Sequence, residues 1–144
     1  MEILKDFLAP GGFVFMGFPA WQMPFGGHQQ IAAGKFVSHM PFLHLLPAKF
    51  YRCILNVSGE RADTVKELLE IKETRCPIEL FERVVRDSGF SVAESEFWFV
   101  KPHYETKFGL KPRRLSRAVA AIPWLRNFFC SGCLYVLHKN EEQI

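Results

Sequence analysis

The sequence contains no long hydrophobic run and little net charge, and these absences exclude several classes of protein. No stretch approaches the ~20 consecutive apolar residues that a membrane span needs. No N-terminal stretch combines a basic start, an apolar run and a small-residue cleavage site, so we expect a cytoplasmic protein. The net charge of +3 over 144 residues is too small to indicate nucleic-acid binding without a clustered basic face.

Cysteine is also sparse. Cys53, Cys76, Cys130 and Cys133 have the spacing of neither a disulfide framework nor a metal site, so no metal is expected. Cys130 and Cys133 fall in a segment typical of a strand, where residues three apart point to opposite faces. We therefore expect their sulfurs to diverge as buried structural thiols, unless Gly132 forms a bulge that brings them together in a zinc or redox role.

The composition is that of a folded protein of one domain. Hydrophobic residues make up 49% and charged residues 23% of the chain, far from the signature of disorder. There is no internal repeat. Fifteen phenylalanines indicate either a heavily aromatic core or a large apolar surface that something else covers.

The first 18 residues predict the tail of a helix followed by a strand. Apolar residues in Glu2–Leu8 have helical spacing, but the segment is too short for an independent helix, and Pro10-Gly11-Gly12 ends it. Phe13–Phe18 is apolar without alternation, which is typical of a strand buried on both faces of a parallel sheet. Such a strand needs a neighbour on each side.

Residues 19–75 predict a lid-like insertion. Its first part is irregular and aromatic, with prolines that block long regular elements. A helix is expected over Pro47–Val57, and a second helix opens at Thr64, which has capping-box spacing to Glu67.

Residues 76–144 predict a helix, a strand, an excursion and a final strand. The helix begins at Pro77 and ends before Gly89, with Glu79 and Glu82 each paired to an arginine one turn on. The strand covers Phe90–Val100, and its apolar phase slips, which predicts a bulge near Glu94–Glu96.

The excursion consists of a basic connection, Lys101–Lys111, and a helix from about Pro112 to Ile122. The final strand covers Leu134–Leu137 and extends back toward Phe128. Residues 141–144 are expected to form a loose tail.

Two junctions in this chain resemble those of class I S-adenosylmethionine-dependent methyltransferases. They are Leu8-Ala9-Pro10-Gly11-Gly12 before the first strand, and Asp87-Ser88-Gly89-Phe90 before the next. The stretch from Pro24 to Gln30, together with His44-Leu45-Leu46-Pro47, is similar to one subfamily, of the methyltransferase type 11-like kind. In that family the Pro-Gly-Gly junction lies past the middle of the domain, so the whole chain resembles a C-terminal half.

The resemblance implies an α/β fold, the C-terminal part of a Rossmann-like methyltransferase sheet. It would have three strands, the last one antiparallel and inserted between the other two, plus the lid insertion. The strand that would precede Phe13–Phe18 is absent, so we expect an exposed flank that invites self-association or pairing with a missing N-terminal half.

The resemblance also implies that the intact domain binds S-adenosylmethionine, but the family's glycine-rich cofactor loop has no counterpart here. Gly11-Gly12 begins a strand and does not open a helix, as an anion-binding loop would. No strand stands immediately before Gly26-Gly27. No cofactor-binding residue is assigned, and we expect the chain alone not to bind the cofactor.

The acceptor pocket of the family is built partly from segments after its fourth and fifth strands, which points to the insertion. His28, beside Gly26-Gly27, is the candidate general base; the alternative is a histidine that caps a helix. Candidate binding residues for an apolar or aromatic acceptor are Trp21, Phe25, Gln29, Gln30 and His44. The alternative for them is the core.

Arg113, Arg114 and Arg117 are the candidate anion-binding residues, because the predicted helix places Arg113 and Arg117 on one face. A solvated face is the alternative. The expected function is the acceptor side of a methyltransferase, inactive by itself. The alternative is a non-catalytic module that binds a partner or membrane surface, and a nucleic-acid methyltransferase is a third possibility.

Overall fold

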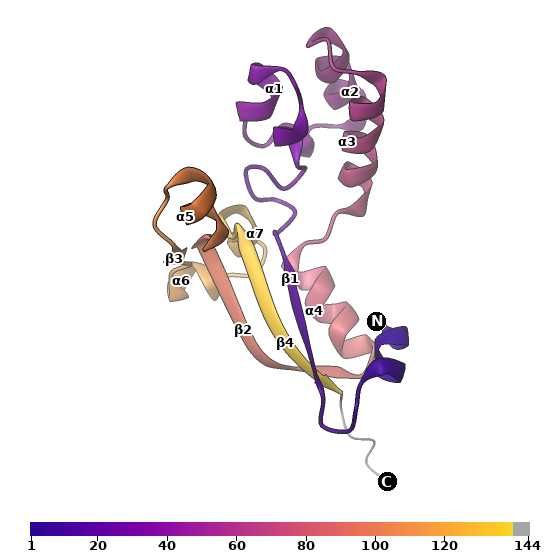
Figure 1. Ribbon diagram of the computed structural model, residues 1–144, viewed down its shortest axis with the longest axis vertical. Coiled ribbons are helices and arrows are strands. Elements are labelled where there is room, and N and C mark those ends of the chain that lie inside the picture. Colours follow the sequence, from indigo (N-terminus) through magenta and orange to yellow (C-terminus); the bar gives the residue numbers. More distant parts are fainter. Residues whose placement is uncertain (140–144) are drawn as a thin grey trace. The chain divides into compact units, whose positions relative to one another are not determined.

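The computed structural model describes residues 1–139, and the tail expected over 141–144 lies outside the described residues. The chain divides into two compact units (Figure 1). The sheet unit consists of Met1–Ala20 and Pro77–Ile144, and the helical unit is Trp21–Cys76. Among the described residues, no helix has the length and apolar character to cross a membrane.

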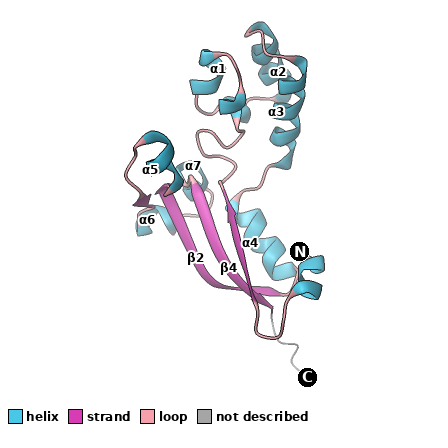
Figure 2. Cartoon of the chain, viewed as in Figure 1, coloured by secondary structure: helices cyan, strands magenta, loops and turns pink. Residues whose placement is uncertain are grey.

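The described part of the sheet unit contains four strands and several short helices (Figure 2). In chain order they are η1 (Glu2–Phe7), β1 (Phe13–Phe18), α4 (Ile78–Asp87), β2 (Phe90–Val100), α5 (His103–Phe108), β3 (Arg113–Arg114), α6 (Arg117–Ala120), α7 (Leu125–Phe129) and β4 (Gly132–Lys139). The helical unit contains η2 (Gln29–Ile31), α1 (Lys35–His39), η3 (Leu43–Leu45), α2 (Ala48–Val57) and α3 (Ala62–Thr74).

The strands and helices together form an α/β fold, and the strand order of the sheet is β1-β4-β2-β3. Every neighbouring pair is antiparallel, so β1 and β2 run parallel to each other on either side of β4. The expectation that the last strand lies antiparallel between the first two is confirmed. The expected bulge is also present, since the β2–β4 register shifts between Val92 and Glu94.

The two faces of this sheet are different. In β4 the burial alternates, with Cys133, Tyr135 and Leu137 buried and the residues between them half-buried. The buried side, here named the covered face, packs on α4, where the Phe81 ring lies 4.7 Å from the rings of both Phe18 and Tyr135. The opposite side, the open face, carries Phe15 of β1.

The prediction that β1 is buried on both faces is wrong. Phe13 is 63% and Phe15 68% exposed, because the described residues cover only one face of the strand. Within the described chain β1 pairs with β4 alone and lies at the sheet edge. The exposed flank that the resemblance implied is therefore present in this part of the chain.

The sequence predicted the positions of some helices correctly and of others wrongly. Helix α2 occupies the predicted segment, whereas Thr64 is inside α3, after the N-cap Arg61, so the capping-box prediction is wrong. The segment Glu2–Phe7 is a 3-10 helix, and the predicted connection Lys101–Lys111 contains α5.

The final strand does not extend back toward Phe128. Leu125–Phe129 is the helix α7, because Arg126 and Asn127 bind the carboxylate of Glu79 on α4. Those contacts also replace the expected pairing of Glu79 and Glu82 along their own helix.

The helical unit has its own core. Buried side chains from α1, η3, α2 and α3, and from the residue after η2, meet there: Ala32, Val37, Leu43, Tyr51, Leu55, Val65 and Leu68. The first and last residues of the unit are joined, since the Trp21 amide donates to the Cys76 carbonyl over 3.3 Å.

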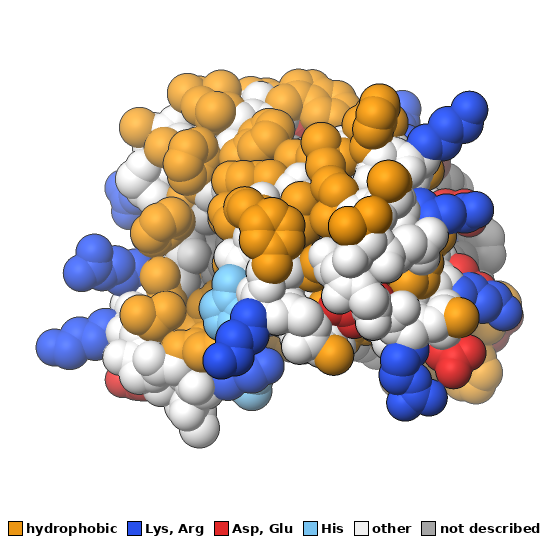
Figure 3. Space-filling model, turned by 90° about the horizontal axis from the view of Figure 1, so that it is seen from above, with side chains coloured by type: hydrophobic (Ala, Val, Ile, Leu, Met, Phe, Trp, Pro, Cys, Tyr) orange, Lys and Arg blue, Asp and Glu red, His pale blue; other side chains and the backbone are white. Residues whose placement is uncertain are grey.

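Figure 3 shows many hydrophobic side chains on one face of the surface. The large exposed ones belong to both units. In the helical unit these include Phe36 at 59% and Phe50 at 65% exposed. Both alternatives drawn from the phenylalanine content therefore apply, because Phe81 and Phe90 are buried while others lie on the surface.

Candidate functional site

A cavity of about 400 Å³ lies in the sheet unit where β1 and β2 end and β4 begins. Its walls come from these strand ends and the loops beside them: Gly17, Phe18, Pro19, Trp98, Lys101, Pro102, His103, Ser131, Gly132, Cys133 and Leu134. In open α/β sheets, ligands bind in the crevice outside the carboxyl ends of the parallel strands. This cavity occupies that position relative to β1 and β2.

Ser131 holds one wall of the cavity in place. Its hydroxyl accepts from the Lys101 amide over 3.0 Å and donates to the Trp98 carbonyl over 3.2 Å, and the Ser131 amide donates to the same carbonyl. A side chain on Gly132 would place a Cβ 3.1 Å from the Lys101 Cβ. The start of β4 therefore packs closely against the end of β2.

The cavity combines apolar walls with a few polar groups, as small-molecule sites do. Burial lowers the pKa of the Lys101 ammonium below its ordinary value, and the nearby charge of Lys107 lowers it further. The Lys101 Nζ lies 5.0 Å from the Tyr104 ring centroid, a cation–π geometry. The buried indole N–H of Trp98 has no acceptor among the described residues, so this wall holds an unused donor.

A polar network on the covered face supports α7, which leads into the cavity wall. The Arg126 guanidinium binds Glu79 over 2.9 Å and Glu82 over 2.6 Å. Asn127 donates to the second Glu79 oxygen and accepts from the Ile78 amide. The Tyr135 hydroxyl donates to Glu82 over 3.0 Å.

Burial and hydrogen bonding shift the pKa values of Glu79 and Arg126 in opposite directions. Burial raises the pKa of the Glu79 carboxyl, but hydrogen bonds from the Trp124 amide, Asn127 and Arg126 outweigh it, so the pKa lies below its ordinary value. Burial lowers the pKa of Arg126, and the hydrogen bonds to Glu82 and Glu79 raise it above its ordinary value. Both shifts favour the charged forms of Glu79 and Arg126.

Cys130 and Cys133 are brought together beside the cavity. Cys130 follows α7 and Cys133 is the second residue of β4. Their sulfurs lie 3.4 Å apart, so the prediction that they diverge is wrong. The strand was predicted too long, and Cys130 lies in the turn before it.

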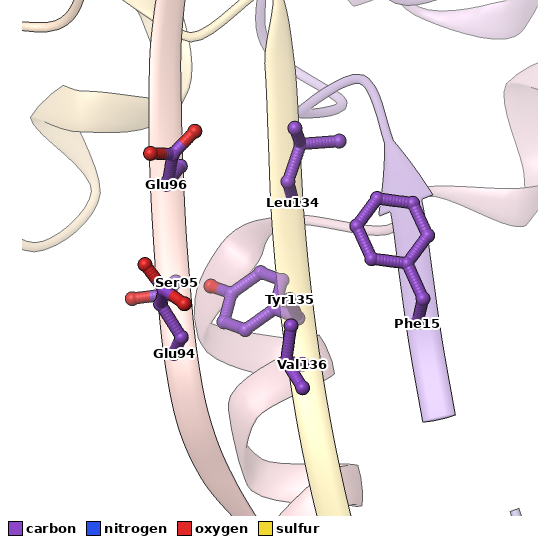
Figure 4. A pocket seen from close by; sticks show the side chains of 7 residues that line it. All are labelled: Phe15, Glu94, Ser95, Glu96, Leu134, Tyr135 and Val136. Atoms are coloured by element: carbon purple, nitrogen blue, oxygen red, sulfur yellow. The ribbon is translucent and has the colours of Figure 1, made fainter. Parts of the chain in front are cut away.

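A second hollow, of about 260 Å³, lies on the open face. Figure 4 shows Phe15 of β1, Leu134 and Val136 of β4, and the carboxylates of Glu94 and Glu96 from β2 around it. Glu96 is bound by the Arg114 guanidinium. This hollow has apolar walls on one side and acidic groups on the other.

The candidate residues of the insertion are divided between core and surface. Trp21 and His44 are buried against each other, with ring centroids 4.7 Å apart, and the His44 Nε2 hydrogen bonds with the Trp21 carbonyl. Gln29 is buried and donates to the carbonyls of Pro24 and Met40. These three side chains hold the irregular segment together by binding protein groups.

His28, Gln30 and Phe25 differ from that group. His28 and Gln30 are exposed and Phe25 is half-buried. His28 has a left-handed backbone conformation at the N-cap of η2, without a side-chain capping bond. The helix-capping alternative for His28 is therefore wrong.

The interior of the helical unit also contains a cation. Burial lowers the pKa of His44, and the neighbouring charge of Lys72 lowers it further. The Lys72 ammonium donates to the His44 carbonyl and lies about 6 Å from the rings of Trp21 and Tyr51. Burial raises the pKa of Tyr51 to about 12.

The three candidate anion-binding arginines do not share a helix. Arg113 and Arg114 form β3, and only Arg117 is in α6, so the predicted helix from Pro112 is wrong. Pairing with β2 takes these residues into the sheet. The guanidinium of Arg114 lies 5.5 Å from the Trp98 ring centroid and binds Glu96. All three arginines are exposed.

Comparison with family models, with curated proteins and with solved structures gives no match to this chain. In the described residues there is no cluster of His, Cys, Asp or Glu that could hold a metal ion.

Sequence reasoning missed most of the cavity. Trp98, His103 and Ser131 carry no motif, and Lys101 was read only as part of a basic connection. Their position along the chain could have located them. Each residue lies at or just after the end of a predicted parallel strand, or just before the strand between the two.

Proposed function

We propose that this chain is the C-terminal portion of an S-adenosylmethionine-dependent methyltransferase with a Rossmann-like sheet. It contributes the last three strands and an acceptor-side lid formed by residues 19–75. The observation that carries the proposal is the order β1-β4-β2, in which the last strand is antiparallel between two parallel ones. The methyltransferase resemblance implied this arrangement.

The edge of the sheet supports the same proposal. β1 is the edge strand of the described chain, yet its exposed side chains include Phe13 and Phe15. Soluble proteins usually protect such edges with charge, proline or a covering element. A parallel strand from an N-terminal half would cover this edge, and helices from that half would cover the open face.

The residues in hand do not fit S-adenosylmethionine. The Gly12 amide bonds back to the Ala9 carbonyl and leads into β1. The space beside Gly27 is filled, because a Cβ there would lie 2.2 Å from the His44 Cβ. Neither glycine pair opens a long helix, so we assign cofactor binding to the absent half and derive no step through the cofactor.

We assign the methyl acceptor to the cavity beside Lys101. Its apolar walls suit an apolar or aromatic acceptor, and the Lys101 ammonium suits a polar or anionic group on it. Methyl transfer depends mainly on positioning the acceptor, and a base is needed only if the acceptor loses a proton.

The decisive experiment extends the chain. The DNA upstream of the Met1 codon is translated in frame, and the longer product is purified beside the 144-residue chain. Isothermal titration of S-adenosylmethionine is expected to give binding with the longer chain and none with the shorter one. A stop codon directly upstream, or a folded longer chain without binding, would contradict the proposal.

A second measurement tests the shorter chain alone. Incubation with methyl-labelled cofactor and a panel of small aromatic acceptors is expected to give no transfer. Transfer by this chain would overturn the assignment of cofactor binding to another segment.

The rival function is a non-catalytic module that binds a membrane surface. The exposed rings of Phe36 and Phe50 in the helical unit favour it. Flotation with anionic liposomes distinguishes the two, because the rival predicts binding that Phe36→Ser with Phe50→Ser abolishes. The methyltransferase proposal predicts no flotation of either form.

A further inference from the structure

The two thiols beside the cavity have the geometry of a pair that can be oxidised. The Cys130 and Cys133 sulfurs are 3.4 Å apart and both residues are fully buried. A disulfide needs a sulfur separation of about 2.05 Å, so closing the bond requires a shift of little more than an ångström. Gly132 lies between them, where Lys101 leaves little room for a side chain.

We propose that Cys130 and Cys133 form a reversible redox pair, which closes to a disulfide in the presence of hydrogen peroxide. Cys133 lines that cavity, as do Ser131 and Gly132 of the same segment. The cavity therefore adjoins the segment that carries the pair, while both thiols are themselves buried. This inference is independent of the proposed function.

The chemistry balances with hydrogen peroxide as the oxidant. The first sulfur, as thiolate, attacks one peroxide oxygen and the O–O bond breaks. The departing hydroxide takes up the proton that this thiol had released, so a sulfenic acid and water result. The second sulfur then attacks the sulfenic sulfur, the S–S bond forms and the S–O bond breaks. The departing hydroxide takes the second thiol's proton and leaves as water, so each thiol has lost one electron and peroxide has gained two.

The surroundings favour this pair over the other cysteines. The hydrogen bond from the Cys133 thiol lowers the pKa of Cys130 below its ordinary value; burial opposes this, while backbone groups and the Arg126 charge support it. Burial raises the pKa of Cys76. Cys53 is exposed, and no second thiol contacts Cys53 or Cys76 in the described structure.

Oxidation would act directly on the cavity wall. Ser131, enclosed within the new ring, bonds to the Trp98 carbonyl and the Lys101 amide. Drawing the sulfurs together moves this segment relative to the end of β2. The pair therefore couples redox state to the shape of the site.

The test uses the full chain and tryptic mapping. Cys130 and Cys133 fall in one peptide after Arg126, while Cys53 and Cys76 fall in two others. The reduced chain is treated with graded hydrogen peroxide, alkylated without reduction, and digested. We expect alkylation of the Cys130–Cys133 peptide to halve at a peroxide concentration at least tenfold below that for the Cys53 peptide.

The modified peptide should have lost two hydrogens, and dithiothreitol should restore its alkylation. Cys133→Ser should remove the reversible product, and Cys53→Ser should leave it unchanged. Loss of alkylation at the same peroxide concentration as Cys53, or conversion to sulfinic acid without a disulfide, would overturn the proposal.

Discussion

The covered and open faces of the sheet are built from the same strands yet differ in almost every physical respect. On the covered face, Cys133, Tyr135 and Leu137 are fully buried under α4 and α7. On the open face, Phe15 is largely exposed beside Glu94. Since side chains alternate along a strand, the same strands present a packed core on one side and exposed apolar side chains on the other.

The difference teaches that apolar character alone does not indicate burial. Phe15 and Phe81 are the same residue type in the same unit, and one is 68% and the other 8% exposed. A large exposed apolar area on a sheet marks an interaction site.

The largest expected effect tests this contrast directly. Phe81→Ala removes a ring packed on Phe18 and Tyr135 and should lower the free energy of unfolding by about 3–5 kcal/mol. Phe15→Ala should change it by less than about 0.5 kcal/mol. Urea unfolding of both variants measures this, and similar losses would mean that the open face is covered.

The next effect compares two arginine–carboxylate contacts. Arg126→Met leaves Glu79 and Glu82 partly buried without their cation. It should lower the free energy of unfolding by about 2 kcal/mol. Arg114→Met, on an arginine whose side chain is 68% exposed, should cost less than about 1 kcal/mol. Equal costs in denaturant titrations would remove the distinction between the faces.

A smaller effect concerns the stability of the folded chain at acidic pH. The pKa of Glu79 in the folded chain lies below its ordinary value of 4.5, so the folded state binds this proton less readily than the unfolded state. Its stabilising contribution is present above that ordinary value and is lost as pH falls through the folded pKa. Between about pH 5 and pH 3 the stability should fall less steeply in Glu79→Gln than in the parent chain. An equal slope in the two chains would contradict this assignment to Glu79.

The smallest expected effect is on association. An unpaired apolar edge favours pairing with another chain, so sedimentation at increasing concentration should detect self-association of the parent chain. Phe15→Glu should weaken that association about tenfold, roughly 1.4 kcal/mol, while leaving the unfolding midpoint unchanged. A monomeric parent chain would show that the edge is protected in another way.

Much of the fold followed from local signals. Glycine and proline positions, with apolar runs between them, predicted β1 and β2 with their observed ends, and helices α2 and α4. The antiparallel place of the last strand came from the family resemblance. The extent of β4 was misjudged, because Phe128 and Phe129 are apolar whether they belong to a strand or a helix.

The candidate site was predicted much less well from the sequence. Trp21, Gln29 and His44 were singled out for their chemistry, but they are buried and bind protein groups. Gly27 explains part of their arrangement, since His44 occupies the place of its side chain. A motif that looks functional in sequence can be a packing device, and contact partners are needed to decide.

The amino-acid sequence by itself determined where the strands and the longer helices run, because caps, turns and periodicity act over a few neighbouring residues. Only the tertiary structure decided that Cys130 meets Cys133, that Arg126 joins α7 to α4, and that a cavity opens beside Lys101. These contacts depend on how segments far apart in the chain are positioned in space, and no short-range signal encodes that.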